Sequence, residues 1–159
     1  MIIYRSILGP YFTYCCIVWD NISETQIVNL QKLQNRGARI ITGASYLQRS
    51  SHVLCELGWM TLETKRKRQK AILMFKILNG LTPRFLSEMF THSASFHAYG
   101  LRSSRMNLAL PKSHTEFYRN SFAFTRPKIW NDLPNTLKEE SSLKRFMSRL
   151  DHYYQHQQN

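Results

Sequence analysis

The sequence predicts a mainly α-helical domain with a small irregular or β element around residues 99–124. Apolar residues recur at helical spacing over residues 23–42 and 142–154, and helix-capping residues bound a long run over residues 61–80. After Thr91 the periodicity disappears, and Ser, His, Gly and Thr become common. These observations place helices on both sides of the irregular segment.

The composition favours a folded domain that binds polyanions. Its 159 residues suffice for one domain, or a domain plus a tail, and a hydrophobic content of 43% excludes a disordered chain. The formal net charge is +12, and no acidic residue lies between Glu24 and Glu56 or between Glu63 and Glu88. Clustered positive charge of this kind attracts nucleic acid. An anionic membrane is a poorer match, because no free basic amphipathic helix is evident.

The N-terminal stretch is aromatic and apolar from its first residue, which predicts a chain cut from a longer protein. Pro10 is expected to open a helix that runs to Trp19 and turns four side chains toward a core: Phe12, Cys15, Cys16 and Trp19. The apolar run over residues 7–19 is too short to span a bilayer and is broken at Gly9-Pro10.

Cysteine usage and the N-terminal run indicate an intracellular protein, cytoplasmic or nuclear. Cys15 and Cys16 are adjacent and Cys55 is left over, so all three are expected to stay reduced. No small-residue cleavage site follows the apolar run, so it does not look like a secretory signal. No membrane partner is expected.

A second helix is predicted from Ser23 to Thr42, ending at Gly43. Ser23 is a favoured N-cap, and Gln26 is placed to complete a capping box. One face of the helical wheel is apolar and is expected to be buried: Ile27, Leu30, Leu33, Gly37, Ile40 and Ile41.

The opposite face of this helix carries a cationic stripe of Lys32, Arg36 and Arg39, with Gln31 and Asn35 beside it. Cationic and amide groups in one row can follow a phosphate backbone. An ordinary solvated helix face has the same composition, so both interpretations stay open.

A short helix is expected over residues 51–57, ending at Gly58, with Trp59 packed under the following central helix. His52 and Cys55 are three residues apart and share a face as possible metal ligands. A zinc site needs a second such pair, and the sequence has none at the required spacing. No metal is therefore predicted.

The central helix is predicted between Thr61 as N-cap and Gly80 in the left-handed position after the C-cap, with Pro83 beyond. Its second half is apolar on every side, which is typical of a helix surrounded by protein. The centre of the core is expected to be Ile72, Leu73, Phe75, Ile77 and Leu78, with Trp19, Trp59 and Trp130 around them.

The first half of the central helix is basic: Lys65, Arg66, Lys67, Arg68 and Lys70. We expect this half to project from the core. It is then either a solvated helix end or a surface that meets phosphates.

Shorter elements are expected after the central helix. A helix over residues 83–90 should bury Phe85, Leu86, Met89 and Phe90. The remaining expectations are short strands at residues 99–102 and 108–111, a strand or helix start at 117–124, a helix over 127–133 stopped by Pro134, and a final amphipathic helix over 142–154.

The sequence contains no recognisable catalytic set. Its ten acidic residues are scattered, whereas a two-metal polymerase or nuclease site needs several converging carboxylates. It has no glycine-rich phosphate loop and no nucleophile elbow, and its six histidines are dispersed. We therefore predict a chain that is not an enzyme on its own and takes no cofactor.

Six blocks occur in order along the chain: YRSILGPYFTYCCIVWD, LQKLQNRGARIITG, ELGWMTLETKRKRQKAILMFKILNGLTPRFL, YGLRSSRMNLALPK, NSFAFTRPKIWNDLP and SSLKRFMSRL. Together they resemble the C-terminal segment of the reverse-transcriptase (RNA-directed DNA polymerase) polyprotein of Jockey-type non-LTR (LINE-like) retrotransposons. The most specific pieces are LQNRGARIITG, FKILNGLTPRFL and IWNDLP taken together, and the resemblance extends to about Leu150. Gly37 and residues 125–127 depart from the pattern and alter backbone preference only. The abrupt N-terminus fits a truncated copy.

The resemblance implies a non-catalytic fragment. In that family an endonuclease domain and a reverse-transcriptase domain precede this segment, and the catalytic aspartates lie upstream, so none has a counterpart here. Residues 1–90 would form a thumb-like helical bundle, residues 91–155 a C-terminal extension with short strands and a terminal helix, and residues 156–159 a disordered tail. The segment would contact template RNA or target DNA, and in a full-length parent the upstream reverse-transcriptase domain would be its partner.

We therefore predict a non-catalytic fragment that contacts nucleic acid. The expected phosphate contacts are Lys32, Arg36, Arg39, Lys65, Arg66, Lys67, Arg68 and Lys70. If about six of them engage phosphates, the affinity falls roughly a thousand-fold between low and moderate salt, without sequence specificity. The alternatives are a structural or protein-interaction remnant that binds no nucleic acid, and a decayed product that does not fold cooperatively.

Overall fold

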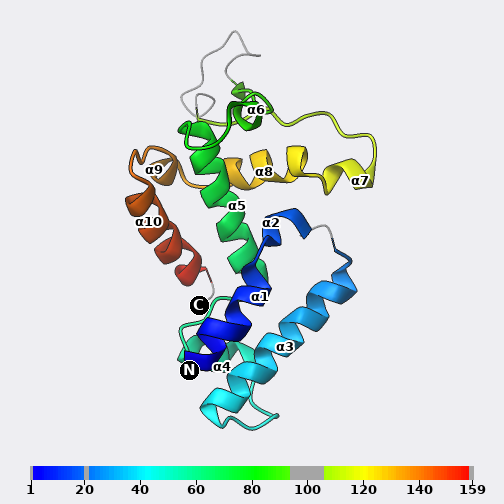
Figure 1. Cartoon of the computed structure of the whole chain (residues 1–159), viewed down its shortest axis with the longest axis vertical. Coiled ribbons are helices and arrows are strands. Elements are labelled where there is room, and N and C mark those ends of the chain that lie inside the picture. Colours follow the sequence, from blue (N-terminus) through cyan, green and yellow to red (C-terminus); the bar gives the residue numbers. More distant parts are fainter. Residues whose placement is uncertain (1, 20–21, 94–105, 158–159) are drawn as a thin grey trace. The chain divides into compact units, whose positions relative to one another are not determined.

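The computed structural model describes residues 2–19, 22–93 and 106–157, and within them the chain is mainly α-helical, as predicted. Strand-like pairing in those ranges is confined to one isolated antiparallel bridge between His92 and Leu108. The elements run in this order (Figure 1): a π-helical turn η1 (Tyr4–Leu8), α1 (Gly9–Thr13), α2 (Cys16–Trp19), α3 (Glu24–Thr42), α4 (Ser50–Glu56), α5 (Leu62–Leu78), α6 (Arg84–Ser87), α7 (Glu116–Arg119), α8 (Phe122–Asn131), α9 (Asn135–Lys138) and α10 (Leu143–His156).

The chain divides into two compact units. Unit 1 comprises Met1–Lys67 and Tyr154–Asn159, and unit 2 comprises Arg68–Tyr153. Helices α5 and α10 each contribute residues to both units. The domain boundaries expected after residues 90 and 155 stay predictions.

The N-terminal helix is interrupted, which corrects the continuous helix expected over residues 10–19. Tyr14 is extended, with ψ of 123°, and Cys15 lies in the left-handed region at φ 48°. A residue in the left-handed region cannot continue a right-handed helix, so a new helix, α2, begins at Cys16. Cys16 is buried as expected, whereas Cys15 is exposed. The side chain of Trp19 lies outside the part of the chain that the structure describes.

Both ends of α3 follow the prediction. The Ser23 side chain accepts a bond from the Gln26 amide at 3.4 Å, and the Gln26 side chain accepts one from the Ser23 amide at 3.2 Å. This pair is the expected capping box. The helix ends at Gly43, whose φ of 70° suits a residue without a Cβ.

The buried face of α3 is rotated away from the predicted apolar face. Gln34 and Ala38 are fully buried, while Leu33 is 57% and Ile40 is 74% exposed. The side-chain amide of Gln34 donates to the carbonyl of Met60 at 3.0 Å, which satisfies this buried polar group. The buried side of α3 therefore includes a glutamine that the hydrophobic pattern does not assign to the core.

The core of unit 1 is built on two aromatic rings. Tyr4 stacks on Trp59 with ring centroids 4.0 Å apart, and Ala38, Val53 and Leu54 are buried in the same cluster. Trp59 thus belongs to the unit 1 core, whereas the sequence places it around the apolar half of α5. A Cβ added at Gly37 would lie 3.3 Å from the Tyr4 ring, so Gly37 allows the close approach of this ring.

The ends of α5 also follow the prediction. The Thr64 amide donates to the hydroxyl of Thr61 at 3.2 Å, which is an N-cap contact. Gly80 has φ of 68°, its amide donates to the Ile77 carbonyl, and the Leu81 amide donates to the Lys76 carbonyl. This pair of bonds is a Schellman motif, which closes the helix.

The apolar half of α5 lies in the core of unit 2, as predicted. Phe75 is 1% exposed and stacks on Phe146 of α10 at 4.4 Å between centroids, and Trp130 of α8 lies 6.1 Å from Phe146. The other expected core residues are buried (Ile72 and Ile77) or half-buried (Leu73 and Leu78).

The segment after α5 departs from its prediction at several places. Phe85 is 64% and Met89 is 49% exposed, so α6 buries fewer side chains than expected. The strand expected at residues 99–102 lies outside the described residues, and residues 117–124 form parts of two helices, α7 and α8. Helix α8 begins at Phe122, earlier than expected, and contains Pro127.

Helix α8 holds the residues around Leu108 by side-chain hydrogen bonds. The side-chain amide of Asn131 accepts from the Leu108 amide at 2.8 Å and donates to the Leu108 carbonyl at 2.9 Å. The indole of Trp130 donates to the Met106 carbonyl at 2.9 Å. These bonds add to the single antiparallel bridge, in which the Ser93 amide donates to the Asn107 carbonyl and the Ala109 amide donates to the Thr91 carbonyl.

Candidate nucleic-acid interface

The basic half of α5 does not project into solvent, which corrects the expectation. Arg66 is 3% and Lys70 is 8% exposed. Burial lowers the pKa of Arg66, and Cys16 and Glu63 oppose this shift. A guanidinium or ammonium group that is nearly covered cannot present its charge to a bulky polyanion.

The neighbouring basic residues of α5 are engaged with partners. Arg68 forms a two-pronged pair with Asp151, in which Nε donates to one carboxylate oxygen and Nη2 donates to the other at 2.9 Å. Lys67 pairs with Glu63 one turn earlier on the helix, with Nζ to Oε1 at 2.6 Å. Lys67 is still half exposed and is the most accessible of the five.

Lys65 is also drawn toward the protein. Its ammonium lies 5.9 Å from the centre of the Trp59 ring, and burial lowers its pKa. The ammonium group is attracted by the face of this aromatic ring, in a cation–π interaction. A role in nucleic-acid binding for Lys65, Arg66, Lys67, Arg68 and Lys70 stays a prediction.

The cationic stripe of α3 has a different environment. Lys32 and Arg36 are exposed and lie one helical turn apart. Among the residues that the structure describes, neither side chain takes part in a hydrogen bond or an ion pair. Their charges are therefore available to a ligand.

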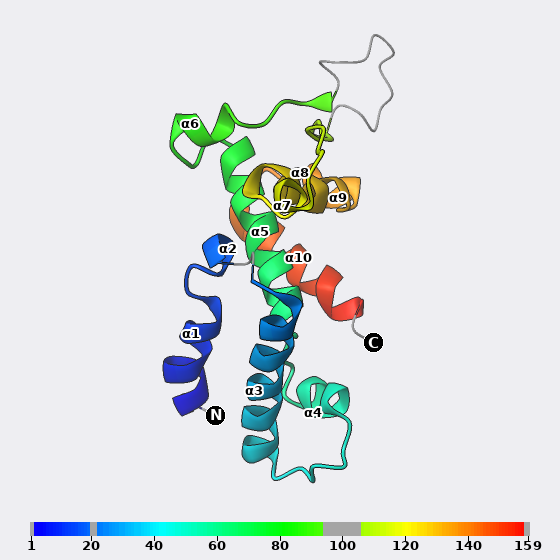
Figure 2. The ribbon, with the colours of Figure 1, turned by 90° about the vertical axis from the view of Figure 1, so that its right-hand side faces the viewer.

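Arg39, the third member of the stripe, is held in place by the loop that joins α3 to α4. Its Nη2 donates to the Gln48 carbonyl at 3.1 Å and to the Ser50 hydroxyl at 2.8 Å. Its guanidinium carbon lies 5.4 Å from the centre of the Tyr46 ring. Helices α3 and α4 lie side by side (Figure 2). The two bonds of Arg39 fasten the loop between them.

These side chains line an open hollow of about 620 Å³ on unit 1. The lining is formed by Lys32, Asn35, Arg36, Arg39, Tyr46 and Ser50. It contains three cations, one aromatic ring and no carboxylate. Positive charge in a concave surface concentrates the electrostatic potential, which favours an anionic ligand.

Gln31 is positioned by the protein rather than left for phosphate contact. Its amide group donates to Gln34 at 2.8 Å and to Asn35 at 2.9 Å, and its oxygen accepts from the Leu62 amide at 2.9 Å. Gln31 thus links α3 to the start of α5. The residues beside the cationic stripe shape the scaffold that carries it.

Tyr46 is the aromatic residue of this hollow, and it was not singled out from the sequence. It is 87% exposed. The sequence feature that could have pointed to Tyr46 is its position in a short loop directly after the helix that carries the cationic stripe.

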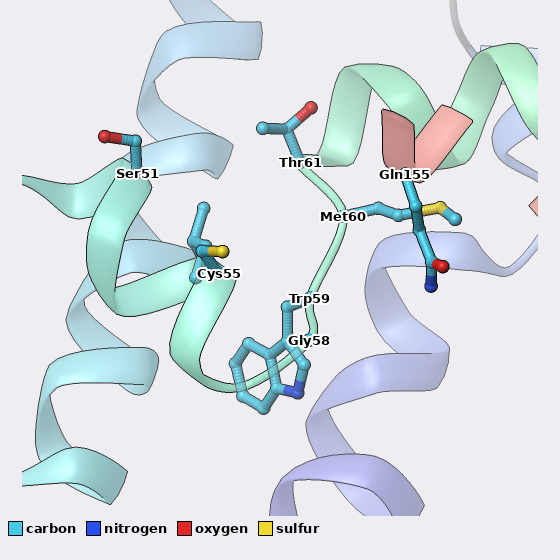
Figure 3. A pocket seen from close by; sticks show the side chains of 8 residues that line it. Ser51, Cys55, Gly58, Trp59, Met60, Thr61 and Gln155 are labelled. Carbon is cyan, nitrogen blue, oxygen red and sulfur yellow. The ribbon is translucent and has the colours of Figure 1, made fainter. Parts of the chain in front are cut away.

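A second hollow of about 380 Å³ lies on unit 1 near Trp59 (Figure 3). Figure 3 shows Cys55 of α4 and the Trp59 indole around it, with Met60 and Thr61 on the connection to α5 and Gln155 on α10. Its lining residues include no histidine, carboxylate or cation, so they cannot act as a base for the Cys55 thiol.

His52, considered as a metal ligand with Cys55, accepts or donates a hydrogen bond at Nδ1 with the Gln48 side chain at 3.0 Å. Across residues 2–19, 22–93 and 106–157, no three His, Cys, Asp or Glu side chains gather as metal ligands.

None of the described helices combines the length and the apolar character needed to cross a lipid bilayer.

Comparison with known proteins gives one partial similarity. Over 60 residues, or 38% of this chain, the sequence is 35% identical to a protein of Drosophila melanogaster described as a probable RNA-directed DNA polymerase from transposon X-element. The aligned part covers 7% of the length of that polymerase. No protein-family model and no solved structure matches the chain. Part of this chain is therefore similar to part of a transposon reverse-transcriptase-related protein.

Proposed function

We propose that the chain is a non-catalytic fragment of a Jockey-type retrotransposon reverse transcriptase, from its C-terminal segment, and that it binds RNA or DNA through the cationic hollow on α3. The polymerase similarity supports the first part of this proposal. One observation carries the second part: Lys32 and Arg36 stand exposed beside Arg39, in a hollow whose lining has no acidic residue. Contacts of this kind neutralise phosphates and carry no sequence information.

The experiment is a salt titration of the purified chain against a labelled single-stranded RNA and a labelled duplex DNA, read by fluorescence anisotropy. The test variant is K32E/R36E. The matched control is K144E/R145E, which makes the same charge change at two exposed residues of α10. Both variants have the same net charge, so a difference between them locates the surface and excludes a general charge effect.

The wild-type chain is expected to bind both polymers, with affinity falling as salt rises. If Lys32 and Arg36 each neutralise one phosphate, their reversal makes the slope of log affinity against log salt less steep by about 1.4 for a single strand. The control variant should keep the wild-type slope. No binding at low salt by a cooperatively folded chain would refute the proposal, and equal losses in both variants would refute the assignment to the hollow.

A second function, a protein-interaction remnant without nucleic-acid binding, is favoured by exposed apolar side chains. Leu33 and Ile40 stand outward from α3, and more apolar surface lies on the N-terminal helices: Ile2, Ile3, Ile7, Leu8, Tyr11, Tyr14 and Val18. The partner would be the upstream reverse-transcriptase domain of a full-length parent. Titration of that purified domain with the wild-type chain and with L33S/I40S tests this function, which predicts binding that the double substitution weakens.

A further inference from the structure

We propose that the hollow on α3 holds an unpaired nucleotide of a single strand, with its base stacked on Tyr46 and the adjoining phosphates at Lys32 and Arg36. This inference rests on the proposed nucleic-acid binding and names the form of nucleic acid that the hollow selects. It also gives Arg39 a separate role, as a positioning residue for the Tyr46 loop.

The first support is the exposure of the Tyr46 ring. The side chain lines the hollow and is 87% exposed, and the guanidinium of Arg39 lies near the ring at 5.4 Å. The exposed remainder of the ring can accept a planar, apolar partner. Stacking of a base on an aromatic side chain is the usual way in which proteins hold single strands, because every base has a flat face.

The second support is the ordering of the loop that carries Tyr46. The Leu47 amide donates to the Ser45 hydroxyl at 3.3 Å, and the Gln48 amide donates to the Ser45 carbonyl at 3.1 Å. Arg39 then fixes the far side of the loop through the Gln48 carbonyl and Ser50. A ring on an ordered loop loses little conformational entropy when it stacks.

The third support is the placement of the free charges. Lys32 and Arg36 are four residues apart on α3, which is about 6 Å along the helix axis. Two cations in one row can contact successive parts of one strand while the base turns toward Tyr46. In a duplex the bases are already stacked and paired, so Tyr46 gains no partner without unpairing, which costs a few kcal/mol.

Arg39 contributes in a different way from its two neighbours on the stripe. Its Nη2 is already used by the loop, so it cannot offer a phosphate the full fork of a free arginine. Its charge still raises the potential in the hollow. Lysine at this position keeps the charge and loses the two-point attachment of the loop.

The experiment compares the affinities of one protein for three probes of equal length: single-stranded oligouridine, single-stranded oligothymidine and a blunt duplex DNA. Heparin serves as a fourth probe, because it is a polyanion without bases. The variants are Y46A, Y46W and R39K, with Y11A as the matched control at another exposed tyrosine, which is 78% exposed on α1. Circular dichroism and urea unfolding check that each variant folds.

The inference predicts that Y46A weakens single-strand binding by about five- to 150-fold, the range measured for lost base stacking. Duplex and heparin affinities should stay within about two-fold, Y46W should restore single-strand binding, and Y11A should have no effect. R39K should lower the ratio of single-strand to duplex affinity while leaving heparin binding unchanged. A purely structural role for Arg39 would lower all affinities together.

Two results would overturn the inference. One is unchanged single-strand affinity in Y46A, and the other is an equal loss for single strand, duplex and heparin. If K32E/R36E still abolishes binding in either case, the proposed function survives without the stacked nucleotide. If the folded wild-type chain binds none of the nucleic-acid probes, both proposals fail together. When the chain does bind, a difference between oligouridine and oligothymidine reports a preference for RNA or DNA within the same site.

Discussion

The two most basic stretches of this chain lie in contrasting environments. On α5, Arg66 and Lys70 are buried and Arg68 is paired with Asp151. On α3, Lys32 and Arg36 are exposed and line a hollow. The denser run of positive charge in the sequence is therefore the less accessible one in the fold.

Whether a basic residue stays accessible therefore depends on how much of its helix is covered by the rest of the protein. Helix α5 is covered on several sides. Its basic residues therefore either bury the aliphatic part of the side chain or contact a carboxylate or an aromatic ring. Helix α3 is covered on one side only, around Gln34 and Ala38, which leaves the opposite stripe in solvent. A charge count along the sequence cannot separate these two situations.

The largest effect that tests this comparison is on stability. Reversing a buried cation, as in R66E, should lower the free energy of unfolding by about 3 kcal/mol. The substitution places a carboxylate in a buried position and removes the cation that the neighbouring groups contact. The same reversal at exposed Arg36 should change it by less than about 0.5 kcal/mol. Urea unfolding followed by circular dichroism measures both.

Equal stability of R66E and R36E would contradict the contrast between the two stretches. It would mean that Arg66 reaches solvent and belongs to a binding surface after all. R66M separates charge from volume: it should be better tolerated than R66E, since it removes the buried charge and keeps much of the packing.

An intermediate effect is expected for the pair between Arg68 and Asp151. Both side chains are partly covered, at 19% and 37% exposed, and the two-pronged geometry favours the interaction. A double-mutant cycle of R68A, D151A and the double variant should give a coupling energy of about 1 kcal/mol in urea unfolding. A coupling near zero would show that Arg68 is free to bind other anions.

The features that the sequence predicted well are local ones. The capping box at Ser23, the N-cap at Thr61 and the Schellman motif at Gly80 depend on a few adjacent residues. Each of these motifs satisfies helix-end groups that would otherwise lack partners, so the chain carries its own signal for them. The all-round apolar half of α5 was equally clear, because only burial suits such a helix.

The features that the sequence missed depend on distant partners. The break at Cys15 has no glycine or proline to mark it. The buried side of α3 carries Gln34, which donates to the Met60 carbonyl, and Trp59 stacks on Tyr4. These contacts join residues far apart in the sequence, and hydrophobic periodicity does not encode them.

The candidate site was predicted in part. The stripe of Lys32, Arg36 and Arg39 could be read from helical spacing, and the structure places all three around one hollow. The sequence could not separate the fixed Arg39 from its free neighbours, since that depends on the loop carbonyl of Gln48. Tyr46 was missed because its exposure follows from the path of the loop.

A weaker effect is expected in the pH dependence of stability. Burial lowers the pKa of Lys65 from its usual 10.5, so the unfolded chain binds more protons than the folded chain between the two pKa values. This lysine therefore makes the free energy of unfolding rise with pH over that range. In K65M that contribution is absent, so the stability of K65M relative to wild type should be highest near neutral pH and decline toward about pH 10.

The matched control for this pH dependence is K67M, which makes the same substitution at the more exposed lysine of α5. Urea unfolding at several pH values compares each variant with wild type, which removes the shared contribution of tyrosines and cysteines. A K65M difference that does not change with pH would mean that Lys65 is as solvated as Lys67. The basic half of α5 would then offer at least one further free cation to a polyanion, and the contrast with α3 would be weaker than its burial indicates.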